Sequence, residues 1–535
     1  MTRRSFLTSA AAAAQPAAAK KPSVILIITD DQGFGDLSLH GNSHLQTPNM
    51  DRIATAGAQF TQFQVCPVCS PTRASLLTGR YNYRTGVVDT FKGRSMMDPR
   101  EQTAAELFRD AGYRTAIFGK WHLGDNYPMR AHDQGFAESL VHGGGGLAQP
   151  SDPPPGNHYF NPTLLRNGRF EKVEGYCTDI FFREAIRFIE EHREHPYFLY
   201  LATNAPHTPL EVSDAYVEPF KNKGLDETTQ KVYAMVKNLD DNLGRLLASV
   251  TDPNTILIFM TDNGPQQPRY VAGMRGRKGT VYQGGIRVPF FLRWPAKLAP
   301  GAKIDRIAAH IDVLPTLLDA CAIRPKLPPK FDGRSLLPLL TGNTSWPDRT
   351  IHTQWHRGDT PQLFRAHAAR SQRWKLVNGT ELYDMEKDPA EANDLSAANP
   401  AQVLQMRLLT EAWFRDVSAT RNGYAPPRIH LGTPRENPVL LTRQDRRDTP
   451  PGWVVDVRTP GQYEITILAN PAPAQAQVSF QLGAVTQTAT LAQGQQRLKF
   501  GPRMLPAGPA HLSAKMNTTD TELEVLYVEV RKING

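Results

Sequence analysis

Four apolar segments in the first half of this 535-residue chain each end at a cluster of polar residues. The segment Ser23–Thr29 (SVILIIT) is β-branched and continuously apolar, which predicts a strand buried on both faces. Similar strands are predicted at 115–118, 197–203 and 255–261, and helices at 103–111 and 232–250 lie between them. This alternation is typical of a mostly parallel sheet flanked by helices, where ligands bind beyond the carboxyl ends of the strands. The four polar clusters therefore predict one shared site.

Oxygen-bearing side chains follow the first and the last of these strands. Asp30 and Asp31 come directly after the first, and Asp262 and Asn263 directly after the last. Carboxylates and an amide carbonyl are hard donors that favour Ca²⁺ or Mg²⁺ over zinc or copper. Taken alone, each pair has a structural alternative, because Asp-Asp can cap a helix and Asp-Asn-Gly is a common turn.

The segment Cys69-Ser70-Pro71-Thr72-Arg73 places a thiol beside a fixed cation at the start of a predicted helix. A helix that opens near Pro71 allows the Arg73 guanidinium to return toward residue 69, although Arg73 could equally be an ordinary surface residue. Cys66 and Cys69 also have the C-x-x-C spacing of a redox pair or of half a zinc site. The sequence has no second C-x-x-C, and its other cysteines, Cys177 and Cys321, are isolated.

Further polar candidates follow the middle strands. Lys120 and His122 alternate about Trp121, so on an extended segment both point to one face. His207 lies in the sequence Ala-Pro-His-Thr-Pro, and Lys278 lies in Arg-Lys-Gly-Thr. A lone histidine is more often a buried core residue, so the spacing to Lys120 is what distinguishes His122.

These motifs resemble those of the sulfatase family. The resemblance implies that a formylglycine-generating enzyme oxidises Cys69 to formylglycine, an aldehyde whose hydrate attacks sulfur and later expels sulfate by re-forming the carbonyl. It implies a metal site of Asp30, Asp31, Asp262, Asn263 and residue 69, usually occupied by Ca²⁺ rather than Mg²⁺. By the same resemblance, Lys120 contacts sulfate and the aldehyde hydrate, His122 takes the proton as sulfate leaves, His207 protonates the leaving alcohol, and Lys278 binds sulfate. Gln283 stands where the family often has an acidic residue, and no core role depends on it.

The implied activity is hydrolysis of aryl or carbohydrate sulfate esters. An alternative is a formylglycine-dependent phosphonate monoester or phosphodiester hydrolase, because a metal-held tetrahedral anion is similar whether sulfur or phosphorus is central. Another is a carbohydrate-binding protein with an inert core, against which the complete set of catalytic residue types argues.

The chain divides into several predicted units. Residues 22–345 form the α/β catalytic core, and residues 346–425 form a small antiparallel α+β subdomain that resembles the C-terminal subdomain of sulfatases. A Pro- and Arg-rich linker is expected at 426–451. Short alternating apolar runs with little helical signal predict an appended β-sandwich at 452–535.

The N-terminal segment 1–20 has the features of an export signal. It contains Arg3-Arg4-Ser5-Phe6-Leu7 and a small-residue stretch before Lys20, which resembles a twin-arginine signal for periplasmic or extracellular export. A disordered alanine-rich leader is the alternative, and the apolar part is too short to insert stably in a membrane. The net charge of +9 is spread along the chain, which argues against a nucleic-acid partner.

The organic part of the substrate is not specified by these motifs. The expected partner is a sulfate ester, with a sulfated glycan suggested by the appended sandwich. Loops at 142–146 and 150–159 are predicted to surround the site, although glycine and proline there also describe ordinary connectors. Trp355, His356 and Arg357 are candidate sugar contacts, with structural roles as the alternative.

Overall fold

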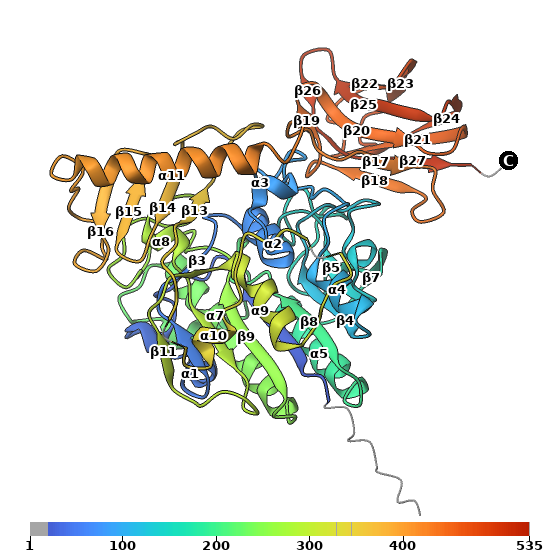
Figure 1. Ribbon diagram of the computed structural model, residues 1–535. Helices are drawn as coiled ribbons and strands as arrows, with labels where there is room; N and C mark the ends of the chain where they lie inside the picture. The colour runs from blue at the N-terminus through green and yellow to red at the C-terminus, as the bar shows by residue number, and fades with distance from the viewer. Residues whose placement is uncertain (1–19, 328, 344, 534–535) are drawn as a thin grey trace, which may run out of the picture.

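The computed structural model describes residues 20–533 except 328 and 344, so the predicted export signal lies outside the described residues apart from Lys20 (Figure 1). A ten-stranded mixed sheet forms the centre of the molecule. Its strands, in spatial order, are β11 (Ala302–Ile304), β2 (Ala58–Phe60), β10 (Phe290–Arg293), β9 (Thr255–Thr261), β1 (Ser23–Thr29), β8 (Tyr197–Ala202), β4 (Arg114–Lys120), β5 (Glu138–His142), β6 (Thr163–Arg166) and β7 (Arg169–Lys172). The five central strands from β9 to β5 run parallel, which confirms the predicted α/β fold.

Helices cover both faces of this sheet because its central strands are apolar on both sides. One face packs against α1 (Pro48–Thr55), α5 (Cys177–Glu191) and α7 (Glu227–Ser249). The other packs against α2 (Cys69–Thr78), α4 (Ala104–Asp110), α9 (Val313–Ala320) and α10 (Leu337–Leu340). The shorter elements are β3 (Phe63–Gln64), α3 (Asn82–Thr85), α6 (Asp214–Val217), α8 (Gln283–Ile286) and β12 (Ala308–Ala309), with 3-10 turns at Ser38–His40, Ala131–Gln134, Glu218–Phe220 and His310–Asp312.

Two helix starts show how local chemistry sets the boundaries. Helix α7 begins earlier than the predicted residue 232, because the Asp226 side chain accepts a hydrogen bond from the Thr229 N–H at 3.0 Å and caps the helix. At α4, Thr103 and Glu106 form a reciprocal capping box. Both caps satisfy backbone donors that the first turn of a helix leaves unpaired.

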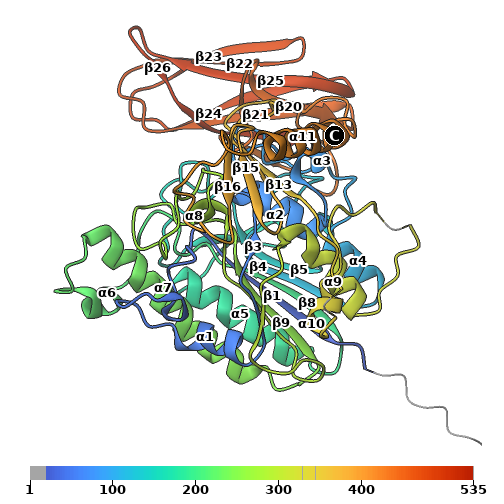
Figure 2. The same cartoon turned by 60° about the vertical axis from the view of Figure 1, so that its left-hand side comes forward.

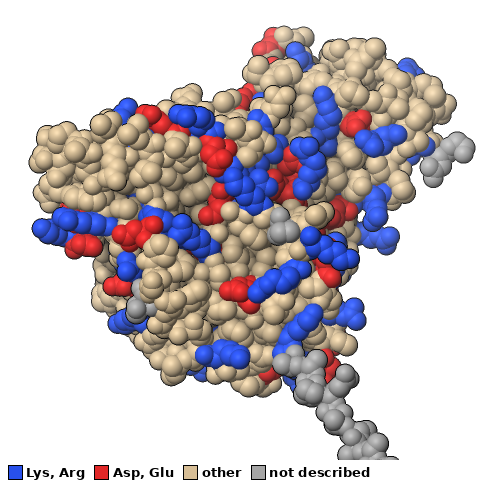
Figure 3. Space-filling model, in the orientation of Figure 1, with Lys and Arg blue, Asp and Glu red and all other residues tan. Residues whose placement is uncertain are grey.

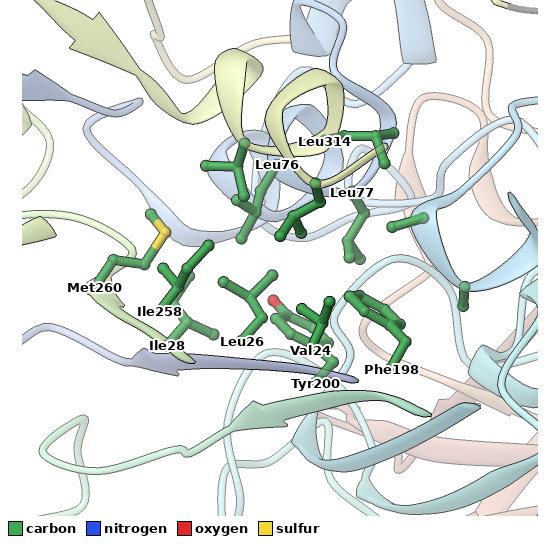
Figure 4. Close-up of a cluster of buried hydrophobic side chains, with 14 of the residues drawn as sticks. Val24, Leu26, Ile28, Leu76, Leu77, Phe198, Tyr200, Ile258, Met260 and Leu314 are labelled. Atoms are coloured by element: carbon green, nitrogen blue, oxygen red, sulfur yellow. The ribbon is translucent and has the colours of Figure 1, made fainter. Parts of the chain in front are cut away.

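The core between the sheet and α2 fixes the position of the Cys69 motif. Val24, Leu26 and Ile28 point from alternate positions of β1 toward Leu76 and Leu77 of α2 (Figure 4). All five side chains are at most 1% exposed. Close packing of this kind holds the N-terminus of α2, and therefore residue 69, beside the strand ends.

A four-stranded antiparallel sheet follows the core. Its strands are β13 (Ile351–Gln354), β14 (His367–Arg370), β15 (Trp374–Val377) and β16 (Glu381–Asp384). Helix α11 (Pro400–Ser418) lies across this sheet, lengthwise in Figure 1 and nearly end-on in Figure 2. Its Met406 packs against Ala369, Leu376 and Leu382. The elements agree with those predicted for residues 346–425.

The C-terminal region is a sandwich of two sheets. One contains β17 (Ile429–Leu431), β20 (Pro451–Val457), β25 (Gly508–Asn517), β22 (Ala476–Leu482) and β23 (Val485–Leu491), with β19 (Arg447–Asp448) and β26 (Glu522–Leu523) at its edges. The other contains β18 (Val439–Thr442), β27 (Val525–Lys532), β21 (Gly461–Ala469) and β24 (Arg497–Leu505). Buried and exposed residues alternate along β22, as expected for a strand with one face in the core.

Residues 426–451 do not form the linker that the sequence predicts. Three of its segments are strands: β17 pairs with β20, β18 pairs with β27, and β19 pairs with β20. These strands are only two to four residues long and are separated by Pro- and Arg-rich turns, so the apolar alternation is too short to read in the sequence. Residues 426–451 are therefore part of the sandwich.

The surface carries mixed charge. On the face shown in Figure 3, Lys and Arg side chains are interspersed with Asp and Glu. Among the described residues, none of the helices is both long enough and apolar enough to span a bilayer.

Candidate active site

The polar clusters predicted from the sequence meet at one edge of the central sheet. Strands β9, β1, β8 and β4 are parallel neighbours, so their carboxyl ends lie side by side. The residues brought together there are Asp30 and Asp31 after β1, Asp262 and Asn263 after β9, Lys120 at the end of β4, and His207 beyond β8. Cys69, the first residue of α2, lies against them, and its Sγ is within 4.8 Å of a carboxylate oxygen of both Asp30 and Asp262.

The acidic side chains form a cluster with unsatisfied oxygens. Asp30, Asp31 and Asp262 are fully buried. The Asn263 side-chain amide donates to Asp31 Oδ1 at 2.7 Å, while Asn263 Oδ1 and Asp30 Oδ1 have no hydrogen-bond partner among the described residues. Buried oxygens of this kind are normally paired, and a hard divalent cation is a partner that fits them. Asp30, Asp31, Asp262 and Asn263 therefore have the composition and placement to hold such an ion.

One buried and one partly exposed lysine contact the carboxylates. Lys120 Nζ lies 2.5 Å from Asp30 Oδ2, and Lys278 Nζ lies 2.6 Å from Asp31 Oδ1. These two lysines balance part of the negative charge and leave their remaining donors beside residue 69. Lys120 is enclosed with the acidic cluster, whereas Lys278 lies between that cluster and the cleft.

Arg73 is an interior residue rather than a surface one. Helix α2 begins at Cys69 itself, before the predicted start near Pro71, and the Arg73 guanidinium turns into the protein. It donates to Asp262 Oδ2 at 2.9 and 3.3 Å and to the Lys120 carbonyl oxygen at 3.1 Å. Arg73 thus connects α2 to the ends of β9 and β4.

The electrostatic environment shifts the pKa values of Asp30 and Asp262 in opposite directions. Burial by itself raises the pKa of Asp30, but the adjacent Lys120, His207 and Arg73 hold that pKa well below its usual value. Burial and the nearby Asp30 carboxylate raise the pKa of Asp262 to about 7. Two carboxylates this close repel each other, and a bound cation relieves that repulsion.

The two cysteines of the C-x-x-C segment have different surroundings. Cys66 Sγ lies 3.4 Å from His310 Nε2 and 3.7 Å from Asn82 Oδ1, whereas Cys69 faces Asp30 and Asp262. Burial raises the pKa of both thiols, and both are free. A redox-active cysteine normally has a lowered pKa, so this environment does not support the redox alternative.

The two candidate histidines are held by backbone carbonyl groups. His207 Nδ1 lies 2.7 Å from the Thr208 oxygen and its Nε2 lies 3.7 Å from Asp31 Oδ2. His122 Nε2 lies 2.6 Å from the Thr90 oxygen. Burial, followed by the charges of Lys278 and Lys120 respectively, lowers the pKa of His207 and His122. Burial therefore favours the neutral form of His122, whereas the Asp30 and Asp31 carboxylates act against the loss of the proton from His207.

The segment that carries His122 is not extended as predicted. Strand β4 ends at Lys120, and His122 has a φ of 59°, in the left-handed region. Trp121 does act as the expected anchor, because it is buried and its Nε1 donates to the Met129 oxygen at 2.9 Å. The backbone turn, rather than strand alternation, sets the direction of the imidazole.

A cleft of about 900 Å³ opens in front of this cluster. Cys69, His122, His207 and Lys278 line it, whereas Arg73 and Lys120 are fully buried behind it. From the two predicted loops, Gly145, Pro150 and Ser151 line the cleft, and Gln149, which lies between the loops, lines it as well. We call the part around Cys69 and Lys278 its floor.

The remaining sequence candidates divide between the cleft and the interior. Trp355 and Arg357 line the cleft, but His356 is not among the lining residues and its Nε2 accepts a hydrogen bond from the Gln362 N–H at 3.1 Å. Residues 90–92 and several sandwich residues also line it, and the sequence analysis missed them. They belong to no motif, so only the three-dimensional arrangement reveals them.

Comparisons with known proteins agree with the motif resemblance. A model of the family described as "Sulfatase" matches residues 22–323, and one described as "N-sulphoglucosamine sulphohydrolase, C-terminal" matches residues 277–414. N-acetylgalactosamine-6-sulfatase of Homo sapiens is 31% identical over 392 residues, which cover 66% of this chain and 72% of that protein. Arylsulfatase A of Homo sapiens is 30% identical over 414 residues, covering 69% and 78% respectively.

Solved structures show the same architecture. The structure of Ps i-CgsB in complex with k-i-k-neocarrahexaose superposes with a TM-score of 0.68 at 28% identity, covering 76% of this chain and 95% of that one. The phosphonate monoester hydrolase of Agrobacterium radiobacter is similar in fold, with a TM-score of 0.54 at 21% identity over 75% of this chain and 96% of that one.

Proposed function

This chain belongs to the sulfatase family and is a sulfuric ester hydrolase, and we propose that it removes sulfate from carbohydrates with a nucleophile made from Cys69. The observation that carries the proposal is the meeting of Cys69 with buried carboxylates, lysines and histidines at the floor of one cleft. The carbohydrate part is supported by the relatives, one of which is named as an N-acetylgalactosamine sulfatase and one of which was solved with a neocarrahexaose.

The residues around position 69 have distinct proposed tasks. The hydrated aldehyde made from Cys69 supplies a hydroxyl that attacks sulfur and leaves a second hydroxyl to release the product. Lys120 and Lys278 bind sulfate oxygens, which carry growing negative charge as the ester bond breaks. The Arg73 guanidinium lies behind the floor and favours ionisation of the attacking hydroxyl.

The two histidines then move protons. His207 lies beside Lys278 at the cleft and protonates the departing alcohol oxygen. His122, held by the Thr90 carbonyl, takes the proton from the remaining hydroxyl when sulfate leaves position 69. The lowered pKa of His122 fits a group that begins the step as a base.

A hard divalent cation fits the acidic cluster because the donors are all oxygens, and calcium rather than magnesium is our choice because it is the usual occupant of this site in the sulfatase family. Asp30, Asp31, Asp262, Asn263 and the converted residue 69 would hold it. When bound, it supplies positive charge that polarises the sulfate group.

Calcium is expected to stabilise the folded protein as well as to support activity. Treatment with a chelator should lower Tm, and added Ca²⁺ should restore it. An ion bound only by the folded state adds about 2.7 kcal/mol to the free energy of unfolding when the free ion concentration is a hundred times Kd. Differential scanning calorimetry measures this without any turnover. The Tm of Asp262→Asn should no longer depend on calcium. If the Tm of the wild-type protein changes with neither chelator nor Ca²⁺, the proposed metal site is wrong.

Substrate selectivity tests the proposed function directly. The matured enzyme should release sulfate from 4-nitrophenyl sulfate faster than it hydrolyses a phosphonate monoester or a phosphodiester with the same leaving group. The phosphorus alternative remains worth testing because a phosphonate hydrolase shares this fold. Faster turnover of either phosphorus compound would reverse our preference.

We also propose that the protein is exported through the twin-arginine signal at residues 1–20. Conversion of Cys69 by a formylglycine-generating enzyme can then precede transport, because this route carries folded proteins.

A further inference from the structure

The C-terminal sandwich supplies one wall of the active-site cleft. Its lining residues come from the segments 443–448, 513–515 and 522–524, and they share the cleft with Cys69 and Lys278. Figure 1 shows β19 and β26, which belong to these segments, at the end of the sandwich above α2 and α3. All of these residues lie beyond 22–414, the part matched by the two family models. We call this surface the sandwich wall.

The sandwich wall is fixed against the catalytic core. Gln444, which is 4% exposed, donates from Nε2 to the Thr90 oxygen at 2.7 Å and to Ser95 Oγ at 2.9 Å. The Gly93 N–H donates a hydrogen bond to the backbone carbonyl oxygen of Gln444 at 3.0 Å. Because the Thr90 oxygen also lies 2.6 Å from His122 Nε2, the wall is connected to a histidine that lines the cleft.

Two basic side chains of the wall form no ion pair with any residue that the structure describes. Arg443 pairs with Glu524 at 2.8 Å, and Arg447 pairs with Asp359 at 3.1 Å. Arg446 and Lys515, in contrast, form no ion pair within the described residues, although both line the cleft. The Arg446 guanidinium lies 5.9 Å from the centre of the buried Trp453 ring, which supports it from behind.

The sandwich wall also carries an unpaired acidic side chain among its described residues. Glu522 of β26 lines the cleft and forms no ion pair in the described part of the chain. Its carboxylate repels an anionic ligand that approaches Arg446 and Lys515. Removal of Glu522 should therefore act in the opposite direction to removal of the cations.

We propose that Arg446 and Lys515 form a second anion-binding subsite, which holds another sulfate group of an oligosaccharide whose scissile sulfate lies at residue 69. This inference rests on the proposed function and adds that the substrate is a multiply sulfated chain. The cleft volume of about 900 Å³ is near the upper end of the range of about 300–1,000 Å³ for ligand pockets, so it has room for more than one sugar. Phe91 and Trp355 line the same cleft and offer aromatic faces for sugar rings.

Binding in a Cys69→Ala background tests the subsite without turnover. The probe is a κ-carrageenan hexasaccharide with sulfate on alternate sugars, measured by isothermal titration calorimetry against the same hexasaccharide after desulfation. Arg446→Ala/Lys515→Ala should raise Kd roughly tenfold for the sulfated probe, as expected for two charge-assisted contacts at a partly solvated wall. Glu522→Ala should lower Kd.

A matched control removes the same charges elsewhere on the sandwich. Arg497→Ala/Lys499→Ala changes one arginine and one lysine of β24, which lie outside the cleft, and should leave Kd within twofold. If the two double variants weaken binding equally, or if the sulfated probe binds no better than the desulfated one, the subsite is refuted. Turnover of 4-nitrophenyl sulfate by the otherwise wild-type double variant reports separately on the proposed function and should be unchanged.

Discussion

Cys69→Ala is expected to abolish sulfate release from every substrate of this enzyme. Loss of a nucleophile that forms a covalent bond to the substrate lowers kcat by about 10⁴-fold or more. The buried thiol lies close to carboxylate oxygens of Asp30 and Asp262, which is where the converted residue would supply the attacking hydroxyl. Initial rates with 4-nitrophenyl sulfate, on protein expressed with a formylglycine-generating enzyme, measure the effect.

Cys66→Ala is the matched control for this result. Cys66 is equally buried but contacts Asn82 and His310 rather than the acidic cluster, so its loss should preserve most of the turnover. Mass spectrometry of the tryptic peptide should show conversion at position 69 and an intact thiol at position 66. Full activity of Cys69→Ala, or an unmodified thiol at position 69 in active enzyme, contradicts the proposed mechanism.

Arg73→Ala is expected to produce the largest loss of stability. The variant leaves Asp262 buried beside Asp30 without its guanidinium partner, and breaking a buried ion pair in this way costs about 3–5 kcal/mol of the free energy of unfolding. Denaturant unfolding monitored by fluorescence, at fixed calcium concentration, measures the change.

Arg80→Ala provides the comparison for Arg73. Arg80 lies just beyond the same helix and pairs with Glu101 at 3.1 Å, with 20% of its side chain exposed. A partly solvated pair of this kind contributes about 1 kcal/mol or less. Equal destabilisation by the two substitutions would mean that the contact of Arg73 with Asp262 has no special role in the fold.

The sheet and its site were readable from the sequence because their signals are local. The continuous apolar segments Ser23–Thr29 and Thr255–Thr261 have the bounds of β1 and β9. Parallel pairing then requires the residues after them, Asp30 and Asp262, to lie at one edge of the sheet. The sulfatase resemblance was confirmed by the comparisons.

The features that the sequence did not predict depend on contacts between residues that are far apart in the chain. Strands β17 and β18 are too short to show a pattern, and they are stabilised by pairing with β20 and β27. The left-handed backbone of His122 follows from the turn after β4, which strand periodicity does not describe. Arg446 and Lys515 are ordinary surface cations in the sequence, and they become notable only because the sandwich lines the same cleft as Cys69.

The Thr90 carbonyl oxygen connects the C-terminal sandwich to His122. This oxygen accepts a hydrogen bond from Gln444 and lies 2.6 Å from His122 Nε2, so the C-terminal sandwich and the proposed proton-transfer residue share one backbone contact. Transplanting a foreign module onto this catalytic unit, or trimming the native one, leaves that anchor without its amide donor. We therefore expect that removal or replacement of the C-terminal sandwich changes the position of the His122 imidazole as well as the preference for ligands.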